Sequence, residues 1–212
     1  MPNRYLALEK YRRTAATYDQ SVSVHLERLR PRIAAHLNLK PGDAVLDAAC
    51  GTGGNFRMIQ EAIGQSGRLI GIDLSTDMLE QARERVSHNG WQNVILIQAT
   101  AEDAKIPEQV DAVLFSFTHD VLRSTAALEN VMRHVKPRAR VVAAGSKWAP
   151  WWAVPVNIGV WYIARKYVTT FEGFARPWSH LERFVPDFKV ETLMLGAVYV
   201  ASGTKSGHLE AA

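Results

Sequence analysis

Cysteine is nearly absent from the sequence, since Cys50 is the only one among 212 residues. A single thiol cannot form a disulfide within the chain, and it cannot build a zinc site from several thiolates. We therefore expect no structural disulfide and no metal ligands, which fits a reducing compartment. The first 20 residues also lack an apolar stretch that ends in small residues, which disfavours a secretory signal. These absences predict a cytoplasmic location.

Internal repeats, low-complexity segments and a high content of charge are also lacking. Charged residues make up 22% of the chain and hydrophobic residues 47%, which excludes an intrinsically disordered protein. A length of 212 residues suits one large domain with a sizeable core. We expect residues 1–212 to form a single domain.

Acidic residues are scarce at the start of the chain. Residues 1–40 hold eight Lys and Arg against three Asp and Glu, a net charge of +5, whereas the whole chain carries +4. A basic segment can meet the phosphates of a nucleic acid or an anionic lipid surface, but it can equally be a solvated helix face. Charge alone leaves these alternatives open.

Short apolar segments alternate with helical ones along most of the chain. Helices are predicted at Ala7–Ser21, Val24–His36, Asn55–Ile63, after a capping Ser75, and at Ala126–Val135. Buried strands are predicted at Ala44–Ala49, Arg68–Leu74, Val94–Gln98, Asp111–Phe117 and Arg140–Ala144. Two further strands, Lys189–Leu195 and Ala197–Ser202, are separated only by Gly196 and predict an antiparallel hairpin. The expected fold is α/β, a doubly wound, mostly parallel seven-stranded sheet with an antiparallel edge hairpin.

The turn after the first strand contains the glycines of a ligand-binding loop. Gly51 and Gly53 let the backbone approach a ligand closely, but neither a dinucleotide Gly-x-Gly-x-x-Gly pattern nor a Walker Gly-Lys-Ser/Thr is present. Asp47 would repel a pyrophosphate but suits a ligand that carries an ammonium or sulfonium group. Asp73 ends the second strand, 20 residues after Gly53, where a carboxylate can accept hydrogen bonds from ribose hydroxyls.

The segment Val45–Gly53, VLDAACGTG, resembles the first motif of class I S-adenosylmethionine-dependent methyltransferases, typically VLDxGCGTG, with Ala49 in place of the first glycine. Ala99–Pro107 resembles their third-strand motif, with Thr100 where an aspartate usually accepts from the adenine amino group. The resemblance covers roughly residues 10–145. It implies a Rossmann-like fold, S-adenosyl-L-methionine as cofactor, and cofactor contacts from Tyr11, Tyr18, Asp47, Ala49, Cys50, Gly51, Gly53, Asp73, Leu74, Met78, Thr100, Ala101, Glu102 and Ser116.

The sequence identifies the residues that would contact the methyl acceptor less clearly than those that would contact the cofactor. The fourth strand ends in Phe115–Asp120, and His119 is the best candidate there for a catalytic base, with Asp120 as a group that orients it. A purely structural histidine is the alternative. No Asn/Asp-Pro-Pro-Tyr tetrapeptide occurs, which excludes the amine methyltransferases that carry it.

The segment Trp148–Ala164 is uncharged over 17 residues and is flanked by Lys147 and by Arg165 and Lys166. As a helix it would span about 25 Å against a hydrocarbon core of ~30 Å, and Pro150, Pro155 and Asn157 interrupt it, so we expect no transmembrane helix. It could lie at a bilayer surface, line an acceptor pocket, or simply cover the sheet. The candidate acceptor contacts are Phe117, His119, Trp148, Trp151, Trp152 and Tyr162.

Together these features predict four parts: lid helices at 1–40, a cofactor-binding core at 41–145, an acceptor cover at 146–187, and a closing hairpin and tail at 188–212. The expected reaction is in-line methyl transfer to a hydrophobic or amphiphilic small molecule such as a lipid amine headgroup, a quinone or an aromatic secondary metabolite. RNA methylation and a non-catalytic regulatory subunit that binds the cofactor are the alternatives, although the lack of an RNA-binding module disfavours nucleic acid. The sequence predicts a cytoplasmic protein with a peripheral membrane contact as an open alternative, and it leaves the oligomeric state open.

Overall fold

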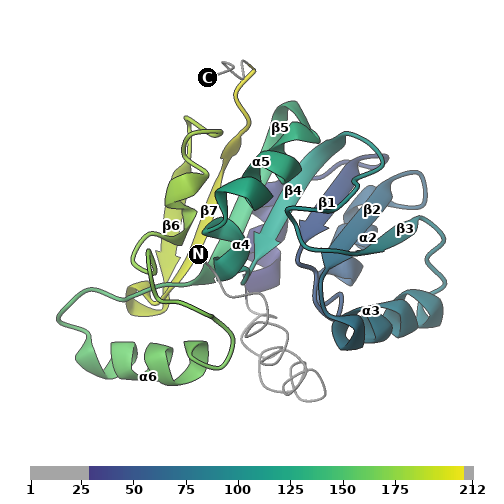
Figure 1. Cartoon of the computed structure of the whole chain (residues 1–212). Coiled ribbons are helices and arrows are strands. Elements are labelled where there is room, and N and C mark those ends of the chain that lie inside the picture. Colours follow the sequence, from purple (N-terminus) through teal and green to yellow (C-terminus); the bar gives the residue numbers. More distant parts are fainter. Residues whose placement is uncertain (1–28, 208–212) are drawn as a thin grey trace.

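The computed structural model describes residues 29–207, and the predictions for residues 1–28 and 208–212 lie outside it. Its centre is one seven-stranded sheet with the order β3-β2-β1-β4-β5-β7-β6 (Figure 1). The strands are β1 (Ala44–Ala48), β2 (Arg68–Asp73), β3 (Val94–Gln98), β4 (Val110–Ser116), β5 (Val135–Ser146), β6 (Lys189–Leu193) and β7 (Val198–Thr204). Strands β1 to β5 pair in parallel, and β7 pairs antiparallel with both β5 and β6. The predicted fold class is confirmed.

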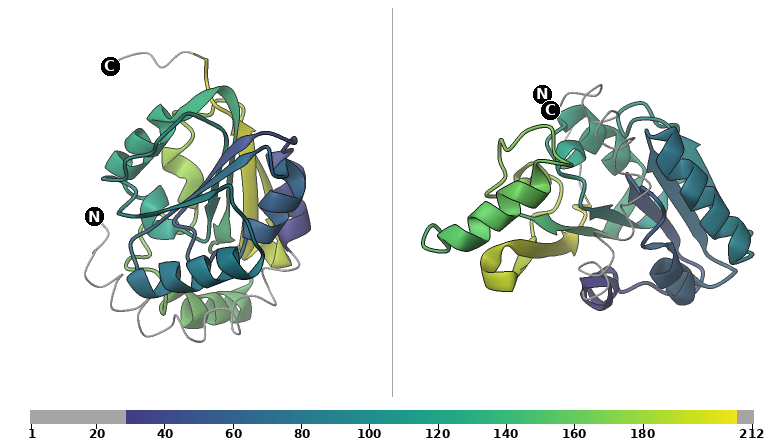
Figure 2. Two further views of the ribbon diagram at one scale, coloured as in Figure 1. Left: turned by 90° about the vertical axis from the view of Figure 1, so that its right-hand side faces the viewer. Right: turned by 90° about the horizontal axis from the view of Figure 1, so that it is seen from below.

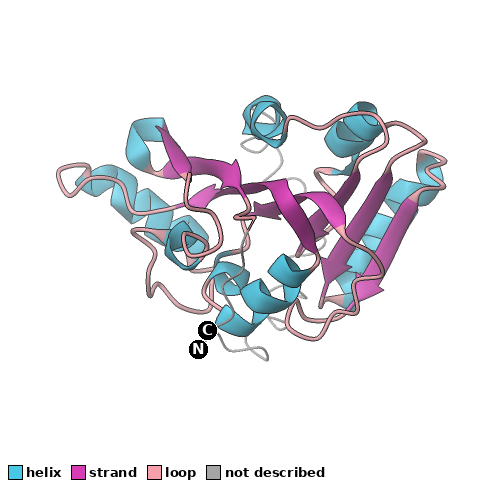
Figure 3. Ribbon diagram, turned by 90° about the horizontal axis from the view of Figure 1, so that it is seen from above, coloured by secondary structure: helices cyan, strands magenta, loops and turns pink. Residues whose placement is uncertain are grey.

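Helices cover both faces of this sheet, as apolar strands in its centre require (Figure 3). One face packs against the helix of residues 29–37, α2 (Phe56–Ile63) and α3 (Thr76–His88). The other packs against α4 (His119–Leu122), α5 (Thr125–Arg133) and the 3-10 turn η1 (Pro177–His180). Helix α6 (Val154–Ala164) lies below the sheet in Figure 1 and belongs to neither layer.

Most predicted boundaries agree with the structure within two residues, but strand β5 is longer than expected. It starts at Val135 and includes Pro137, which the sequence pattern assigns to the end of a helix. The pairing of β5 with β4 shifts register between Val110 and Ala112, and Arg138 has φ 63°. An irregular strand tolerates a proline because no ladder hydrogen bond is lost there.

The predicted edge hairpin is present, but its link is longer than Gly196 alone. The turn η2 (Met194–Gly196) joins β6 to β7, and Met194, Leu195 and Gly196 all have φ between 49° and 86°. A Cβ on Gly196 would lie 2.9 Å from Cδ of Pro150. Glycine is therefore required at this position, because the turn passes close to the segment that precedes α6.

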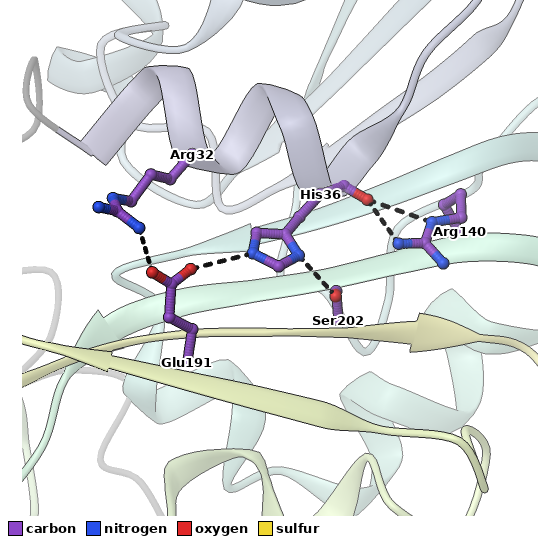
Figure 4. A network of polar contacts seen from close by, with 5 residues as sticks. All are labelled: Arg32, His36, Arg140, Glu191 and Ser202. Carbon is purple, nitrogen blue, oxygen red and sulfur yellow. Dashed lines mark hydrogen bonds and ion pairs between the residues drawn. The ribbon is translucent and has the colours of Figure 1, made fainter.

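A cluster of polar side chains fixes the helix of residues 29–37 to the antiparallel edge (Figure 4). His36 Nδ1 lies 2.9 Å from Ser202 Oγ, and its Nε2 lies 3.3 Å from a carboxylate oxygen of Glu191, which also pairs with Arg32. Arg140 donates two hydrogen bonds, of 2.8 and 3.1 Å, to the His36 carbonyl oxygen. These contacts join β5, β6 and β7 to the end of one helix, whose first described residue is Leu29.

No helix within residues 29–207 is both long enough and apolar enough to cross a membrane.

Candidate active site

The loop between β1 and α2 turns through left-handed backbone at alternate residues. Ala49, Gly51 and Gly53 have φ of 59°, 57° and 74°. Ala49 occupies a conformation that costs a non-glycine residue about 1–2 kcal/mol, so its replacement of the usual glycine has an energetic price. Cys50 is buried, and its backbone N–H donates to the Ile72 carbonyl oxygen at 2.8 Å, which ties the loop to β2.

Gly53 cannot be replaced without moving its neighbours. A Cβ there would lie 2.7 Å from the ring of Phe56, in addition to the strain of its positive φ. We expect Gly53→Ala to lower the free energy of unfolding by about 2–4 kcal/mol, measured by urea denaturation without cofactor. Gly51→Ala is the matched control, because Gly51 has a similar φ and no heavy atom within 4 Å of its Cβ position. Equal losses in the two variants would show that the overlap with Phe56 costs nothing.

Asp47 is the most unusual polar group of this loop. Its side chain is completely buried at the end of β1, and Asn55 Nδ2 donates to its Oδ2 at 3.4 Å. Its Oδ1 has no hydrogen-bond partner within residues 29–207. Burial raises the pKa of Asp47 to about 7, and the negative charge of Asp73 acts in the same direction. A buried carboxylate with an unused oxygen suits a ligand that brings a positive charge, as S-adenosylmethionine does.

Asp73 joins the two loops that end β1 and β2. Its Oδ2 accepts from the Gly51 N–H and its Oδ1 from the Ser75 N–H, both at 2.8 Å. Burial raises the pKa of Asp73, and these backbone donors oppose that effect. Each carboxylate oxygen has two lone pairs, so the remaining ones can accept from ribose hydroxyls. Leu74 follows at the strand end, and Met78 lies buried in the first turn of α3.

The loop after β3 places a carboxylate where the sequence motif has Thr100. Thr100 Oγ1 donates to Asp103 Oδ2 at 2.8 Å, and the Asp103 N–H donates back to Thr100 Oγ1 at 3.2 Å. Asp103 therefore brings a negative charge beside Thr100, and sequence reasoning missed it as a candidate for the adenine amino group. The Thr-x-x-Asp spacing is typical of a side chain that hydrogen-bonds to the backbone three residues later. This spacing could have identified Asp103 from the sequence.

The neighbouring candidates in this loop contact α5. Asn130 Nδ2 donates to the carbonyl oxygens of Ala101 and Ala104, at 2.9 and 3.0 Å. Glu102 Oε1 accepts from the hydroxyl of Ser124, which caps α5, at 2.6 Å. Glu102 is thus held against the start of α5, and this position supports the loop.

A cavity of about 560 Å³ lies beyond the carboxyl ends of β4 and β5. Its walls are mostly apolar and come from Phe117–His119, Gly145, Ser146, the inner side of α6, Phe174, η2 and the start of β7, with Leu29 at one edge. Ser116 ends β4, and Phe117, which follows it and lines the cavity, has φ 57°. A bulky residue held in this sparsely populated conformation is typical of a functional site.

Only two of the candidate acceptor contacts, Phe117 and His119, line this cavity. Trp151 and Trp152 are 87% and 60% exposed, and Tyr162 is exposed as well. Trp148 packs on the rings of Phe171 and Phe174 behind the wall, with ring centroids 5.2 Å apart in both pairs. These four side chains do not line this cavity, and their contact with an acceptor stays a prediction. Helix α6 presents Val156, Val160 and Ala164, spaced by four residues, to the cavity, which turns Tyr162 away from it. The three tryptophans precede this helix.

His119 brings a buried nitrogen to the cavity wall. Its Nε2 lies 3.2 Å from the Glu172 carbonyl oxygen, which can only accept, so Nε2 carries the hydrogen. Nδ1 is then an acceptor, and it is buried without a partner among the described residues, as is Thr118 Oγ1. Burial, together with the nearby charge of Arg123, lowers the pKa of His119 to about 4. The imidazole is neutral near pH 7 and has a free lone pair.

Asp120 does not orient His119, contrary to the prediction. Both of its carboxylate oxygens lie 3.2 Å from the Thr169 N–H, which donates to them. The role of orienting the imidazole falls to the backbone at Glu172 instead, because the first turn of α4 directs residues 119 and 120 to different neighbours. The remaining candidates, Tyr11 and Tyr18, lie outside the described residues.

Known proteins share this arrangement. A family model described as a methyltransferase domain matches residues 45–138. The demethylmenaquinone methyltransferase of Symbiobacterium thermophilum is 25% identical over 93% of this chain and 91% of its own length. The ubiquinone/menaquinone biosynthesis C-methyltransferase UbiE of Ectopseudomonas mendocina is 33% identical over 63% of this chain and 55% of its own length. A solved SAM-dependent methyltransferase from Aquifex aeolicus superposes with a TM-score of 0.57 at 21% identity, over 83% of this chain and 89% of that one.

Some of these matches cover nearly the whole relative, and others cover only part of it. Several of the quinone methyltransferases align over little more than half of their own length, between 55% and 61%. The family match covers β1 to the start of β5, which are the strands that carry the candidate cofactor residues. The sheet order with its antiparallel edge is shared with the solved methyltransferases. The methyltransferase-domain match, the methyltransferase relatives and the shared fold together support a class I S-adenosylmethionine-dependent methyltransferase.

Proposed function

We propose that the chain methylates a ring carbon of an apolar hydroxylated aromatic compound of the quinol type. The observation that carries this proposal is the apolar cavity beyond β4 and β5, whose lining residues include Thr118 and His119. Each has a buried polar atom, Thr118 Oγ1 and His119 Nδ1, without a hydrogen-bond partner among the described residues. An apolar space with a few polar groups suits a ring with hydroxyl substituents. The quinone methyltransferases among the relatives support the same class of acceptor.

The residues of the cavity have separate tasks in such a transfer. When bound, the cofactor supplies a methyl group on a positively charged sulfur. The apolar walls exclude water and align the ring, and Nδ1 of His119 accepts the hydrogen of a ring hydroxyl, which makes the neighbouring carbon more nucleophilic. The ring carbon would form its new bond to the methyl group while the electron pair of the carbon–sulfur bond stays on sulfur. The ring carbon would then release its proton to solvent, and the ring oxygen would take back the proton held by His119 Nδ1, which restores the aromatic hydroxyl and the neutral imidazole.

The test is a product assay with deuterated methyl donor and three acceptors: a short-chain demethylated naphthoquinol, phosphatidylethanolamine vesicles and total RNA. We expect a single labelled methyl on the quinol ring, detected by mass spectrometry. Label found only in phosphatidylethanolamine or only in RNA would contradict the proposal. Most of the basic residues that motivate the RNA alternative lie before residue 29, outside the described residues, so the assay with RNA tests that alternative directly.

The cavity itself gives a second prediction. Val160→Trp places an indole in a space that Val160 already lines, so we expect the KM for the quinol to rise at least about 30-fold, from lost ring contacts worth roughly 2 kcal/mol. The Kd for S-adenosylhomocysteine should not change. Ile158→Trp is the matched control, because Ile158 lies on the same helix but is 63% exposed and lines no part of the cavity. An equal KM in both variants would place the acceptor elsewhere.

A further inference from the structure

Helix α6 is apolar on all sides although most of it is exposed. Its residues Val154–Ala164 carry no charge, and Ala164 is the only buried one. Large apolar side chains of this segment are exposed and line no part of the cavity: Trp151, Trp152, Val154, Ile158, Trp161 and Tyr162. A helix that is hydrophobic all round is normally buried on all sides. The outer face of α6 therefore lacks the partner that its composition requires.

The turn η2 continues this surface. Leu195 is 66% exposed and Met194 is exposed too. The turn packs against the segment before α6, since Gly196 lies close to Pro150 and Ala149. Seen from below, α6 and the turn between β6 and β7 lie side by side at the same end of the molecule (Figure 2). We call these two elements, with Trp151 and Trp152, the apolar face. Contiguous apolar surfaces of this kind mark sites of interaction.

The charged residues that flank α6 in the sequence are all basic. No Asp or Glu occurs in residues 130–171, and Arg165 and Lys166 follow the helix directly. The Arg165 guanidinium lies 4.6 Å from the ring centroids of both Trp161 and Tyr162, and Lys166 Nζ lies 5.3 Å from that of Tyr162. Aromatic rings with cations beside them are typical of the interface between lipid headgroups and acyl chains. The cations complement anionic headgroups.

We propose that the apolar face docks the protein on the surface of a bilayer that contains anionic phospholipids. Trp151, Trp152 and Leu195 enter the headgroup region, and Arg165 contacts lipid phosphates. The same two elements also line the acceptor cavity, α6 through Val156 and Val160 and η2 through Met194 and Leu195, so the docked protein holds the cavity next to the lipid. Entry of an apolar acceptor from the bilayer rests on the proposed function, whereas docking itself does not.

The test is cosedimentation of the full chain with vesicles of phosphatidylcholine, with or without 30 mol% phosphatidylglycerol. We expect the protein to bind the anionic vesicles, and Trp151→Ser/Trp152→Ser to lower the partition coefficient roughly ten-fold. Arg165→Glu should lower it by a similar factor. Lys189→Glu is the matched charge control, because Lys189 is an exposed residue at the start of β6, the opposite end from η2, and its variant should bind like the wild type.

Several outcomes would overturn docking. One is a wild type that binds neither vesicle, and another is a loss of binding that is equal for Arg165→Glu and Lys189→Glu. A wild-type dimer that Trp151→Ser/Trp152→Ser converts to a monomer, without any vesicle binding, would assign the face to a second copy of the chain. Binding of S-adenosylhomocysteine, measured on the same samples by calorimetry, distinguishes these results from a failure of the methyltransferase site.

Discussion

Asp47→Asn is expected to weaken the binding of S-adenosylhomocysteine about 100-fold at pH 8, because a buried carboxylate loses its pairing with the ligand's ammonium group. In the free protein, Asp47 is fully buried with an unpartnered oxygen and a pKa of about 7. The ligand prefers the ionised form. The affinity of the wild type should therefore fall by up to about ten-fold per pH unit below pH 7 and level off above pH 8, and the asparagine variant should show a much flatter profile.

The same substitution should act in the opposite direction on stability. Because the pKa of Asp47 is raised from 3.8 to about 7 on folding, the folded state keeps a proton that the unfolded state has lost. The free wild type thus loses stability as the pH rises from about 4 to 7. The Asp47→Asn variant does not titrate at this position and therefore keeps its stability over this pH range. At pH 8 without ligand, its free energy of unfolding in urea should exceed that of the wild type by up to about 4 kcal/mol.

Calorimetry at pH 6, 7 and 8 together with urea unfolding separates a binding role from a structural one. A merely structural aspartate would lose stability on substitution and leave the slope of affinity against pH unchanged. Asn55→Ala is a useful comparison, since it removes the one hydrogen bond to the Asp47 side chain found within residues 29–207 and keeps the charge. We expect that variant to retain the pH dependence of the wild type.

The sequence predicts the cofactor half of the molecule well because its signals are local. A strand such as Val94–Gln98 is bounded by turn residues, and the structure reproduces its limits. Ser75 accepts from the Met78 N–H as a helix cap should. Gly53 is required by a neighbour only three residues away, Phe56. Contacts of this range leave a pattern in the sequence that can be recognised without the fold.

The acceptor half depends on contacts between distant segments, and there prediction from the sequence is less accurate. Pro155 and Asn157 look like interruptions of a helix, but Pro155 lies in the first turn of α6, where proline is tolerated. Asn157 exchanges hydrogen bonds with the backbone of Ala149, at 2.8 and 3.2 Å. These contacts set where the helix begins, and the starting point decides which side chains face the cavity. Within α6, Trp161 and Tyr162 face away from the cavity for this reason.

His119→Gln is expected to lower kcat for quinol methylation by about 100- to 1,000-fold, the usual range for removing a general base, and to leave the Kd for S-adenosylhomocysteine unchanged. The Glu172 carbonyl, 53 residues away in the sequence, sets the tautomer of His119, and burial lowers its pKa. With a pKa of about 4, the imidazole is neutral above about pH 5, so kcat should show no loss from this group between pH 6 and 8.

His180→Gln is the matched control for this experiment. His180 also has a lowered pKa and a buried Nδ1 without a partner among the described residues, but it does not line the cavity. If His119 acts on the acceptor, kcat should fall in His119→Gln and stay near the wild-type value in His180→Gln. If both variants lose activity equally, or if the loss in His119→Gln appears as a weaker Kd for S-adenosylhomocysteine, His119 supports the fold around α4 and the proton acceptor is another group.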